Sequence, residues 1–454
     1  MRIALVASQS SSPRPRDGAG HSQRVTSLAE ALGRLGHQVT LYAPNGSPAQ
    51  PAKATLAPGV TVEHLPAGPR ESAGSRRPSG GEPALDIPVF SDHLARRWRK
   101  DPPDVAHAHF WTSGLAALAG ARGLNLPVVQ TFQSLGSPEA DGSHSPAGVS
   151  RPARGSRAAR RPASPGRGSR RDGNGTAGRQ QDNGYHLAQI RLQVSLARNA
   201  NAVLATSSEQ MTKLARLGVP RASIRVVPWG VDTGRFAPEG PVAKRNGRPR
   251  LLAVRQSAEE PGLDTVIRAL VEVPGAELLI AGGLSGSGPA NQDLAGLARN
   301  LGVADRITFT GDVSRTHLPA LLRSADLLLS GEWEDPSGTV ALQAMACGTP
   351  VAASVAGVVG DAVIDGTTGF LVPPGQPSAL ARRIRHLFAS PMQLEAFSIA
   401  AVDRARSRYS WDRIGRETVQ AYERCLPHQF PATDEPETED ADSSTEDADS
   451  SLEG

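Results

Sequence analysis

Short apolar segments alternate with amphipathic segments along most of the chain. Unbroken apolar stretches such as Ile3–Ala7 have the length of buried strands. Many are followed by a segment such as Gln23–Leu35, where apolar residues recur every three or four positions, as on one face of a helix. Strands that alternate with helices are typical of parallel sheets covered on both faces. The alternation runs twice, on either side of a linker at Pro238–Pro249. The sequence therefore predicts an α/β fold with two doubly wound units.

The two units are expected to contain the following strands: Ile3–Ala7, Gln38–Tyr42, Val60–His64, Val105–His109, Pro127–Phe132, Ala202–Thr206 and Ile224–Pro228 in the first, and Leu251–Arg255, Glu277–Ala281, Ile307–Thr310, Asp326–Leu329, Pro350–Ala353 and Gly369–Val372 in the second. The expected helices are Gln23–Leu35, Asp92–Arg99, Gly114–Arg122, Tyr185–Asn199, Leu263–Val271, Gln292–Leu301, Thr316–Arg323, Val340–Ala346, Ser378–Phe388, Pro391–Tyr409 and Trp411–Cys425.

Two segments break the alternation and are predicted to be disordered. Residues 137–184 are rich in Ser, Gly, Pro, Ala and Arg without apolar periodicity, and residues 430–454 are acidic, with TEDADSS repeated in tandem. Such segments bury too little apolar surface to offset the entropy cost of ordering. The expected organisation is an N-terminal unit at 1–224 that contains the insert, a C-terminal unit at 225–392, helices at 393–429 that cross back to the first unit, and the tail.

Composition narrows the class of protein. The chain of 454 residues has a formal net charge of +4 and two cysteines, Cys347 and Cys425, too few for a disulfide framework or a metal set. The apolar run Ile3–Ala7 is too short for a signal peptide or a membrane span. We therefore expect a cytoplasmic protein without a transmembrane segment. The arginines of the 137–184 insert could bind phosphate backbones. No stacking aromatic residues accompany them, so nucleic acid is not an expected partner.

A candidate anion site lies between two expected strands, in EDPSGTVALQAMACGTP at Glu334–Pro350. A strand, a short Pro-Ser-Gly turn and a helix place the first backbone N–H groups and the positive end of the helix dipole above the turn. Asp335 stands just ahead of these amides, and Gln343 lies further along the same helix. The pattern predicts a site for a phosphate or another anion.

The order and spacing of several short motifs extend this interpretation. They are DGAGHSQRV at Asp17–Val25, HAHFWTSGLA at His107–Ala116, QTFQSLGS at Gln130–Ser137, ATSSEQ at Ala205–Gln210, VVPWGVD at Val226–Asp232, LGVADRITFTGDV at Leu301–Val313, DGTTGFLVPP at Asp365–Pro374 and RYSWDR at Arg408–Arg413. Together with the two doubly wound units, the series resembles the retaining glycosyltransferases of family 4, which have the GT-B architecture. Within that family it looks similar to actinobacterial relatives of the inositol-phosphate and sucrose-phosphate glycosyltransferases.

The resemblance implies transfer of a hexosyl group, with retained anomeric configuration, from a nucleotide-diphosphate sugar to a small-molecule or lipid-linked acceptor. It implies that the donor lies between the N-terminal, acceptor-side unit and the C-terminal, donor unit. No metal or other cofactor is implied, because protein groups neutralise the diphosphate. The implied catalytic residues are Asp335, His109 and Gln133. The implied donor-binding residues are Gly18, Ala19, Gly20, Gln256, Ser337, Gly338, Thr339, Val340 and Gln343.

Several of these positions depart from the family pattern. An Arg and a Lys of the family, which neutralise the diphosphate, align with Gln256 and Pro261, and a His aligns with Gln133. The two Glu of the donor motif become Asp335 and Gln343. Gln133 can carry neither a proton nor a positive charge, and an amide at 343 accepts a weaker hydrogen bond than a carboxylate. Two functions therefore stay open: an active glycosyltransferase, or a pseudo-glycosyltransferase that binds a ligand or partner without turnover.

Two further features bear on metals and on the acceptor. His107 and His109 lie two apart on an expected strand and so share one face, but two histidines without a third ligand make a weak metal case, and no metal site is predicted. The family's acceptor-side basic residue is replaced by Ser137 and Pro138, which disfavours a phosphorylated acceptor.

Overall fold

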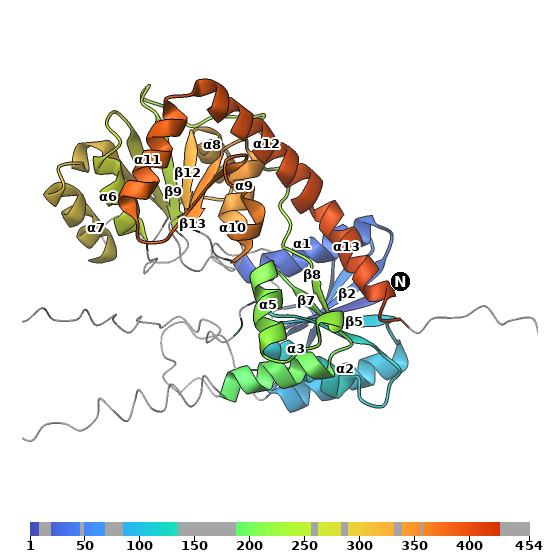
Figure 1. Ribbon diagram of the computed structural model, residues 1–454. Helices are drawn as coiled ribbons and strands as arrows, with labels where there is room; N and C mark the ends of the chain where they lie inside the picture. The colour runs from blue at the N-terminus through green and yellow to red at the C-terminus, as the bar shows by residue number, and fades with distance from the viewer. Residues whose placement is uncertain are drawn as a thin grey trace, which may run out of the picture.

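Two mainly parallel sheets, each with helices packed on its faces, form the two halves of the molecule (Figure 1). The computed structural model describes residues 1–8, 20–45, 50–68, 85–133, 135, 188–255, 262–282, 289–330, 338–354 and 357–426. The predicted disorder of residues 137–184 and 430–454 concerns segments outside the described residues.

The N-terminal sheet has the strand order β3-β4-β2-β1-β5-β6-β7-β8. Its strands are β1 (Arg2–Ala7), β2 (Gln38–Pro44), β3 (Lys53–Ala57), β4 (Val60–Leu65), β5 (Val105–His109), β6 (Val128–Thr131), β7 (Ala202–Ala205) and β8 (Ile224–Val226). Its helices are α1 (Gly20–Arg34), α2 (Ile87–Lys100), α3 (Trp111–Gly120), a helix at residues 188–199, α5 (Ser208–Arg216) and the 3₁₀ turn η1 (Arg221–Ser223).

The C-terminal sheet has the order β11-β10-β9-β12-β13-β14, and its neighbouring strands pair in parallel. Its strands are β9 (Arg250–Arg255), β10 (Glu277–Gly282), β11 (Ile307–Gly311), β12 (Leu327–Ser330), β13 (Val351–Ser354) and β14 (Gly369–Val372). Its helices are α6 (Leu263–Val271), α7 (Pro289–Asn300), η2 (Ala304–Arg306), α8 (Leu318–Arg323), α9 (Thr339–Ala346), α10 (Gly357–Ala362) and α11 (Pro377–Phe388).

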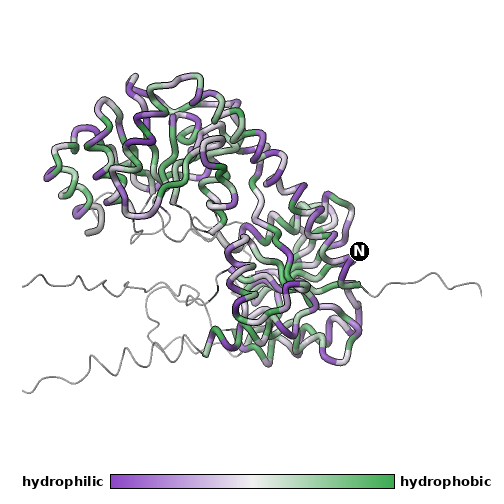
Figure 2. The backbone as a smooth tube through the Cα atoms, viewed as in Figure 1, coloured by the Kyte–Doolittle hydropathy of each residue, from purple (hydrophilic) through white to green (hydrophobic). Residues whose placement is uncertain are grey.

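Each half has its own hydrophobic core around its sheet. The central strands β1, β5, β9 and β12 are apolar along most of their length and buried, as parallel strands covered on both faces must be. In Figure 2 the hydrophobic segments run through the middle of both halves. The prediction of two doubly wound α/β units is confirmed.

Two helices connect the halves at the end of the described chain. α12 (Pro391–Tyr409) packs on the C-terminal half, and α13 (Trp411–Glu423) lies on the N-terminal half next to α1 (Figure 1). Between them Ser410 is extended, with φ −63° and ψ 144°, so the chain changes direction there. Trp411, Ile414 and Tyr422 then enter the N-terminal core. Among the helices described, none is long and apolar enough to cross a bilayer.

Besides the two 3₁₀ turns η1 and η2, three elements were not predicted. β3 pairs antiparallel to β4 at the sheet edge, where its alternating exposure leaves no apolar run to detect. The helices α5 and α10 are short and lie opposite each other across the two halves. There, the backbone N–H of Ser208 donates to Asp361 Oδ2 over 2.7 Å, and that of Gly357 donates to Glu209 Oε2 over 2.7 Å.

Candidate functional site

Each sheet has one place where the order of the strands reverses. The reversal lies between β1 and β5 in the N-terminal sheet and between β9 and β12 in the C-terminal sheet. Ligands of open α/β sheets bind outside the carboxyl ends of the strands at such a reversal. In the C-terminal sheet the carboxyl ends of β9 and β12 lead directly into residues 256–261 and 331–337, which lie outside the described residues. Gln256, Asp335 and Ser337 belong to these segments, so their roles stay predictions.

A cavity of about 290 Å³ lies between the two halves. It is lined by Gln23, Arg24 and Ser27 of α1, by Gly230, Val231, Asp232, Arg235 and Phe236 after β8, by Val254 of β9, by Arg315, by Leu318 of α8, by Thr339, Val340 and Gln343 of α9, and by Trp411 of α13. Both halves and the crossing helix contribute to its wall. Its volume is close to the lower end of the range usual for small-molecule sites.

The start of α9 forms part of the cavity wall. Gly338 is its N-cap, with φ 57° and ψ 18°, a left-handed conformation that glycine adopts without strain. A Cβ at this position would lie 2.9 Å from Cγ1 of Val358, so Gly338 also permits close packing of α10. Ala341, Leu342 and Met345 anchor the helix in the core. Thr339 and Val340 therefore present the N-terminal end of a fixed helix dipole to the cavity, and Gln343 lies one turn further along.

His109 ends β5 and is completely buried, with 0% of its surface exposed. Its ring lies 4.2 Å from that of His107 and 5.9 Å from that of Trp229, between centroids. Neither ring nitrogen has a hydrogen-bond partner, and burial lowers the pKa of His109 to about 3. The imidazole is therefore neutral near pH 7. The structure places His109 next to Trp229, and neither residue lines the cavity described above. The catalytic role of His109 stays a prediction.

The turn after His109 is strained. Phe110 has φ 72° and ψ 153°, a combination that is essentially restricted to glycine. Such a residue costs about 1–3 kcal/mol and persists only where its surroundings hold it. Here the Phe110 N–H donates to the carbonyl of Thr131 over 3.2 Å, and the ring is buried. The strain allows α3 to begin immediately after the strand.

Gln133 follows β6 and is joined to α1 by Arg24. The Arg24 Nη1 atom donates a 3.3 Å hydrogen bond to Gln133 Oε1, and the guanidinium carbon lies 5.6 Å from the ring centroid of Trp229. Gln133 Nε2 is buried without a partner. Arg24 was not predicted as a site residue. The sequence did give one indication of Arg24: it lies on the inward face of the helix expected at Gln23–Leu35. Charged side chains are rarely buried unless they have a partner.

Several buried, uncharged polar groups of the N-terminal half have unused hydrogen-bonding capacity. The buried atoms without a partner include Ser113 Oγ, Gln130 Oε1, Gln133 Nε2, Gln189 Oε1 and both ring nitrogens of His109. Buried polar atoms are normally paired with protein or water, so these unpaired groups favour a site for a polar ligand.

The remaining predicted site residues are only partly described. Gly18 and Ala19 lie outside the described residues, and Gly20 begins α1. His107 has a structural role. Its Nδ1 lies 2.7 Å from the Tyr422 hydroxyl, and its Nε2 lies 2.8 Å from Thr131 Oγ1. Within the described ranges, no three metal-ligating side chains come together.

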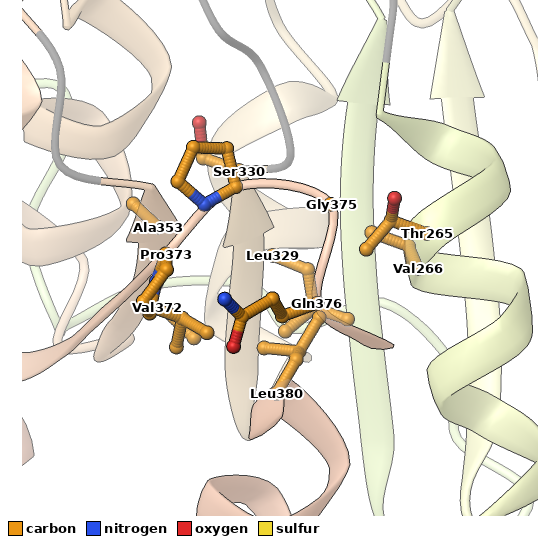
Figure 3. A pocket seen from close by; sticks show the side chains of 12 residues that line it. Thr265, Val266, Leu329, Ser330, Ala353, Val372, Pro373, Gly375, Gln376 and Leu380 are labelled. Carbon is orange, nitrogen blue, oxygen red and sulfur yellow. The ribbon is translucent and has the colours of Figure 1, made fainter. Parts of the chain in front are cut away.

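A second, much smaller pocket lies in the C-terminal half. It measures about 30 Å³ and is lined by residues such as Leu329, Ser330, Val372 and Gln376 (Figure 3). This is space for about one water molecule. A third pocket, of about 310 Å³, adjoins the interdomain cavity and shares Ser27, Val231, Asp232 and Trp411 with it. The interdomain cavity is the candidate site because it alone of the three is lined by the start of α9.

Comparison with known families gives two matches, one on each side of residues 231–238. Residues 19–230 match the glycosyl transferase 4-like domain, and residues 239–404 match the glycosyl transferases group 1. The first match covers α1 and the end of the N-terminal sheet, and the second covers α9.

Individual relatives extend over nearly the whole chain. A D-inositol 3-phosphate glycosyltransferase of Actinosynnema mirum is 30% identical over 445 residues, which cover 93% of this chain and 96% of the relative. The sucrose-phosphate synthase of Thermosynechococcus elongatus has a similar structure, with TM-score 0.69, 23% identity and coverage of 93% and 98%. The Anabaena protein HepE in complex with UDP gives TM-score 0.65, 17% identity and coverage of 93% and 100%.

Proposed function

Because the chain belongs to the group 1 glycosyltransferases, of the family 4 type with GT-B architecture, we propose that it transfers a hexosyl group from a nucleotide-diphosphate sugar to an acceptor hydroxyl. The anomeric configuration is retained and no metal is required. The acceptor is a small molecule or is linked to a lipid. The reaction takes place in the cytoplasm, in line with two cysteines that are both free thiols.

The observation that carries the proposal is the cavity between the halves, with the start of α9 in its wall. In transfer from a nucleotide sugar, negative charge grows on the leaving diphosphate. Fixed backbone dipoles aimed at that charge lower the barrier because they need no reorganisation. Thr339 and Val340 would hold the phosphate together with Ser337, and Gln343 would accept a hydrogen bond from the ribose. Asp335, Gln256 and the Gly18–Gly20 loop complete the proposed donor site.

On the acceptor side, neutral hydrogen-bonding groups support an uncharged, hydroxyl-bearing substrate. Gln133 and Gln189 carry buried amides with unused hydrogen-bonding capacity. Such groups bind hydroxyls but do not neutralise a phosphate. The A. mirum relative bears the name D-inositol 3-phosphate glycosyltransferase. We propose that this chain prefers an unphosphorylated polyol or sugar.

The test is calorimetric titration of the folded protein with UDP, GDP, ADP and their glucose conjugates, with EDTA present. Micromolar binding of one of them supports the proposal and identifies the donor. An acceptor screen with that donor then compares myo-inositol with D-inositol 3-phosphate, and NMR of the product gives the anomeric configuration. No binding to any nucleotide would instead favour the pseudo-glycosyltransferase. A preference for the phosphorylated acceptor would contradict the acceptor proposal alone.

A further inference from the structure

Three arginines from distant parts of the chain line the interdomain cavity. Arg24 comes from α1 in the N-terminal half, Arg235 from the segment that follows β8, and Arg315 from the segment between β11 and α8. Resting on the proposed function, we infer that these arginines form a phosphate-binding cluster for the diphosphate of the nucleotide donor.

The burial and orientation of the side chains suit this role. Arg24 is only 9% exposed, and Arg235 and Arg315 are half-buried. The hydrogen bond to Gln133 and the face of Trp229 hold the Arg24 guanidinium. Arg235 lies 5.7 Å from the ring centroid of Phe236, another residue of the cavity wall. Guanidinium groups held against aromatic rings lose less conformational freedom when they bind an anion.

The charge of the cavity is positive. Among the described residues that line it, Asp232 is the single carboxylate, and its Oδ1 accepts the backbone N–H groups of Gly234 and Arg235. Three guanidinium groups therefore face one carboxylate, and the N-terminal end of α9 adds to the positive potential. A buried anion needs paired cations to offset its lost hydration, and Arg can pair with phosphate through two hydrogen bonds.

The position of the cluster favours the donor as the source of the phosphate. Thr339 and Gln343 of α9 line the same cavity, so a nucleoside diphosphate bound at that helix would reach the arginines. A phosphorylated acceptor has the same ligand chemistry, and the experiment separates the two sources. Arg24 belongs to the N-terminal half, whereas α9 belongs to the C-terminal half, so the diphosphate would also connect the halves.

The test compares the affinity for UDP with that for uridine, in the full chain and in the variants Arg235→Gln and Arg315→Gln. A charged hydrogen bond of about 1.5–3 kcal/mol corresponds to a loss of roughly 10- to 100-fold. We expect each variant to lose at least tenfold in UDP affinity and to keep its uridine affinity. Arg24→Lys, which keeps the charge of the most buried member, should lose less than Arg24→Gln. Arg268→Gln, at an exposed position on α6, is the matched control and should change neither affinity.

Two further probes separate the possible failures. If the two variants keep the ratio of UDP affinity to uridine affinity of the unaltered protein, or lose only the binding of D-inositol 3-phosphate, the inference is overturned while the proposed function stands.

If the unaltered protein binds no nucleoside diphosphate, the proposed function fails. Pyrophosphate then tests the cluster without a base: binding that Arg235→Gln and Arg315→Gln abolish supports a phosphate site, and no pyrophosphate binding overturns it.

Discussion

Two of the proposed site residues, Gln133 and Gln343, carry an amide where a charged or protonatable side chain would also fit. Gln133 is held by Arg24, and Gln343 faces the cavity from α9. An amide both donates and accepts hydrogen bonds without a net charge. We therefore expect specificity to depend on hydrogen-bond geometry, while the charge of the cavity is concentrated on its three arginines.

The substitution Gln343→Glu tests the proposed ribose contact. A carboxylate accepts hydrogen bonds about twice as strong as those of an amide. If Gln343 bonds the ribose hydroxyls, uridine should bind about 3- to 10-fold more tightly to the variant, a gain of roughly 1 kcal/mol. Displacement titration measures the change, and Gln420→Glu, at an exposed position on α13, is the control. Unchanged uridine affinity in Gln343→Glu would remove this residue from the site.

The low pKa of His109 predicts a dependence of stability on pH. Burial holds the pKa near 3 in the folded state, below the ordinary value of 6.5. Above pH 6.5 neither state is protonated. Below it the unfolded chain takes up a proton that the folded protein does not, so the folded state loses about 1.4 kcal/mol per pH unit from this group.

We therefore expect His109→Gln to reduce the acid sensitivity of the protein. Between pH 6.5 and 4.5 the variant should lose roughly 2–3 kcal/mol less unfolding free energy than the unaltered chain. The pKa of His107 is also lowered by burial, so part of the dependence should remain in the variant. Urea titrations at several pH values measure the difference. The exposed His386→Gln on α11 should leave the dependence unchanged, and an equal effect in both variants would contradict the assignment.

At the scale of elements, the proposed donor site depends on the start of one helix, α9. α9 has eight residues and no side-chain cap, and its position depends on the left-handed N-cap and on apolar anchors. The pattern of strand, Pro-Ser-Gly turn and apolar helix was visible in the sequence, and the helix boundary was predicted to within one residue. Its opening onto a cavity shared with α1 and α13 was not visible there.

The substitution Gly338→Ala should move this helix start. The left-handed backbone conformation costs alanine about 1 kcal/mol relative to glycine. The added Cβ would also lie 2.9 Å from Cγ1 of Val358. The matched control is Gly366→Ala, which has φ 73° but no atom within 4 Å of the added Cβ. Both variants should lose about 1 kcal/mol of stability, with a larger loss in Gly338→Ala. Only Gly338→Ala should also weaken UDP binding, and equal UDP affinity in the two variants would argue against a donor role for the start of α9.

At the scale of the whole molecule, α13 ties the end of the folded chain to the first half. Arg34 of α1 pairs with Asp412 over 2.8 Å, but this pair is exposed and contributes little. The buried contact between Tyr422 and His107 matters more, because it satisfies a ring nitrogen that water cannot reach.

We expect Tyr422→Phe to destabilise the N-terminal half by about 1–3 kcal/mol, since His107 Nδ1 is left buried and unpaired. Tyr409→Phe is the control, because that hydroxyl donates to the carbonyl of Asp361, a residue that is only partly buried, whereas His107 is fully buried. Unfolding followed by tryptophan fluorescence compares the two. A loss in Tyr422→Phe no greater than in Tyr409→Phe would show that the buried hydrogen bond does not hold α13.

The sequence by itself determined the alternation of strands and helices and the apolar helix α9, because these depend on neighbouring residues. It did not reveal β3, whose pairing at a sheet edge depends on β4. The tertiary structure alone decided that Arg24, Arg235 and Arg315 line one cavity, since no periodicity relates residues so far apart. It also decided that His109 is neutral near pH 7, because the fold buries this strand end completely and burial lowers the pKa of the imidazole.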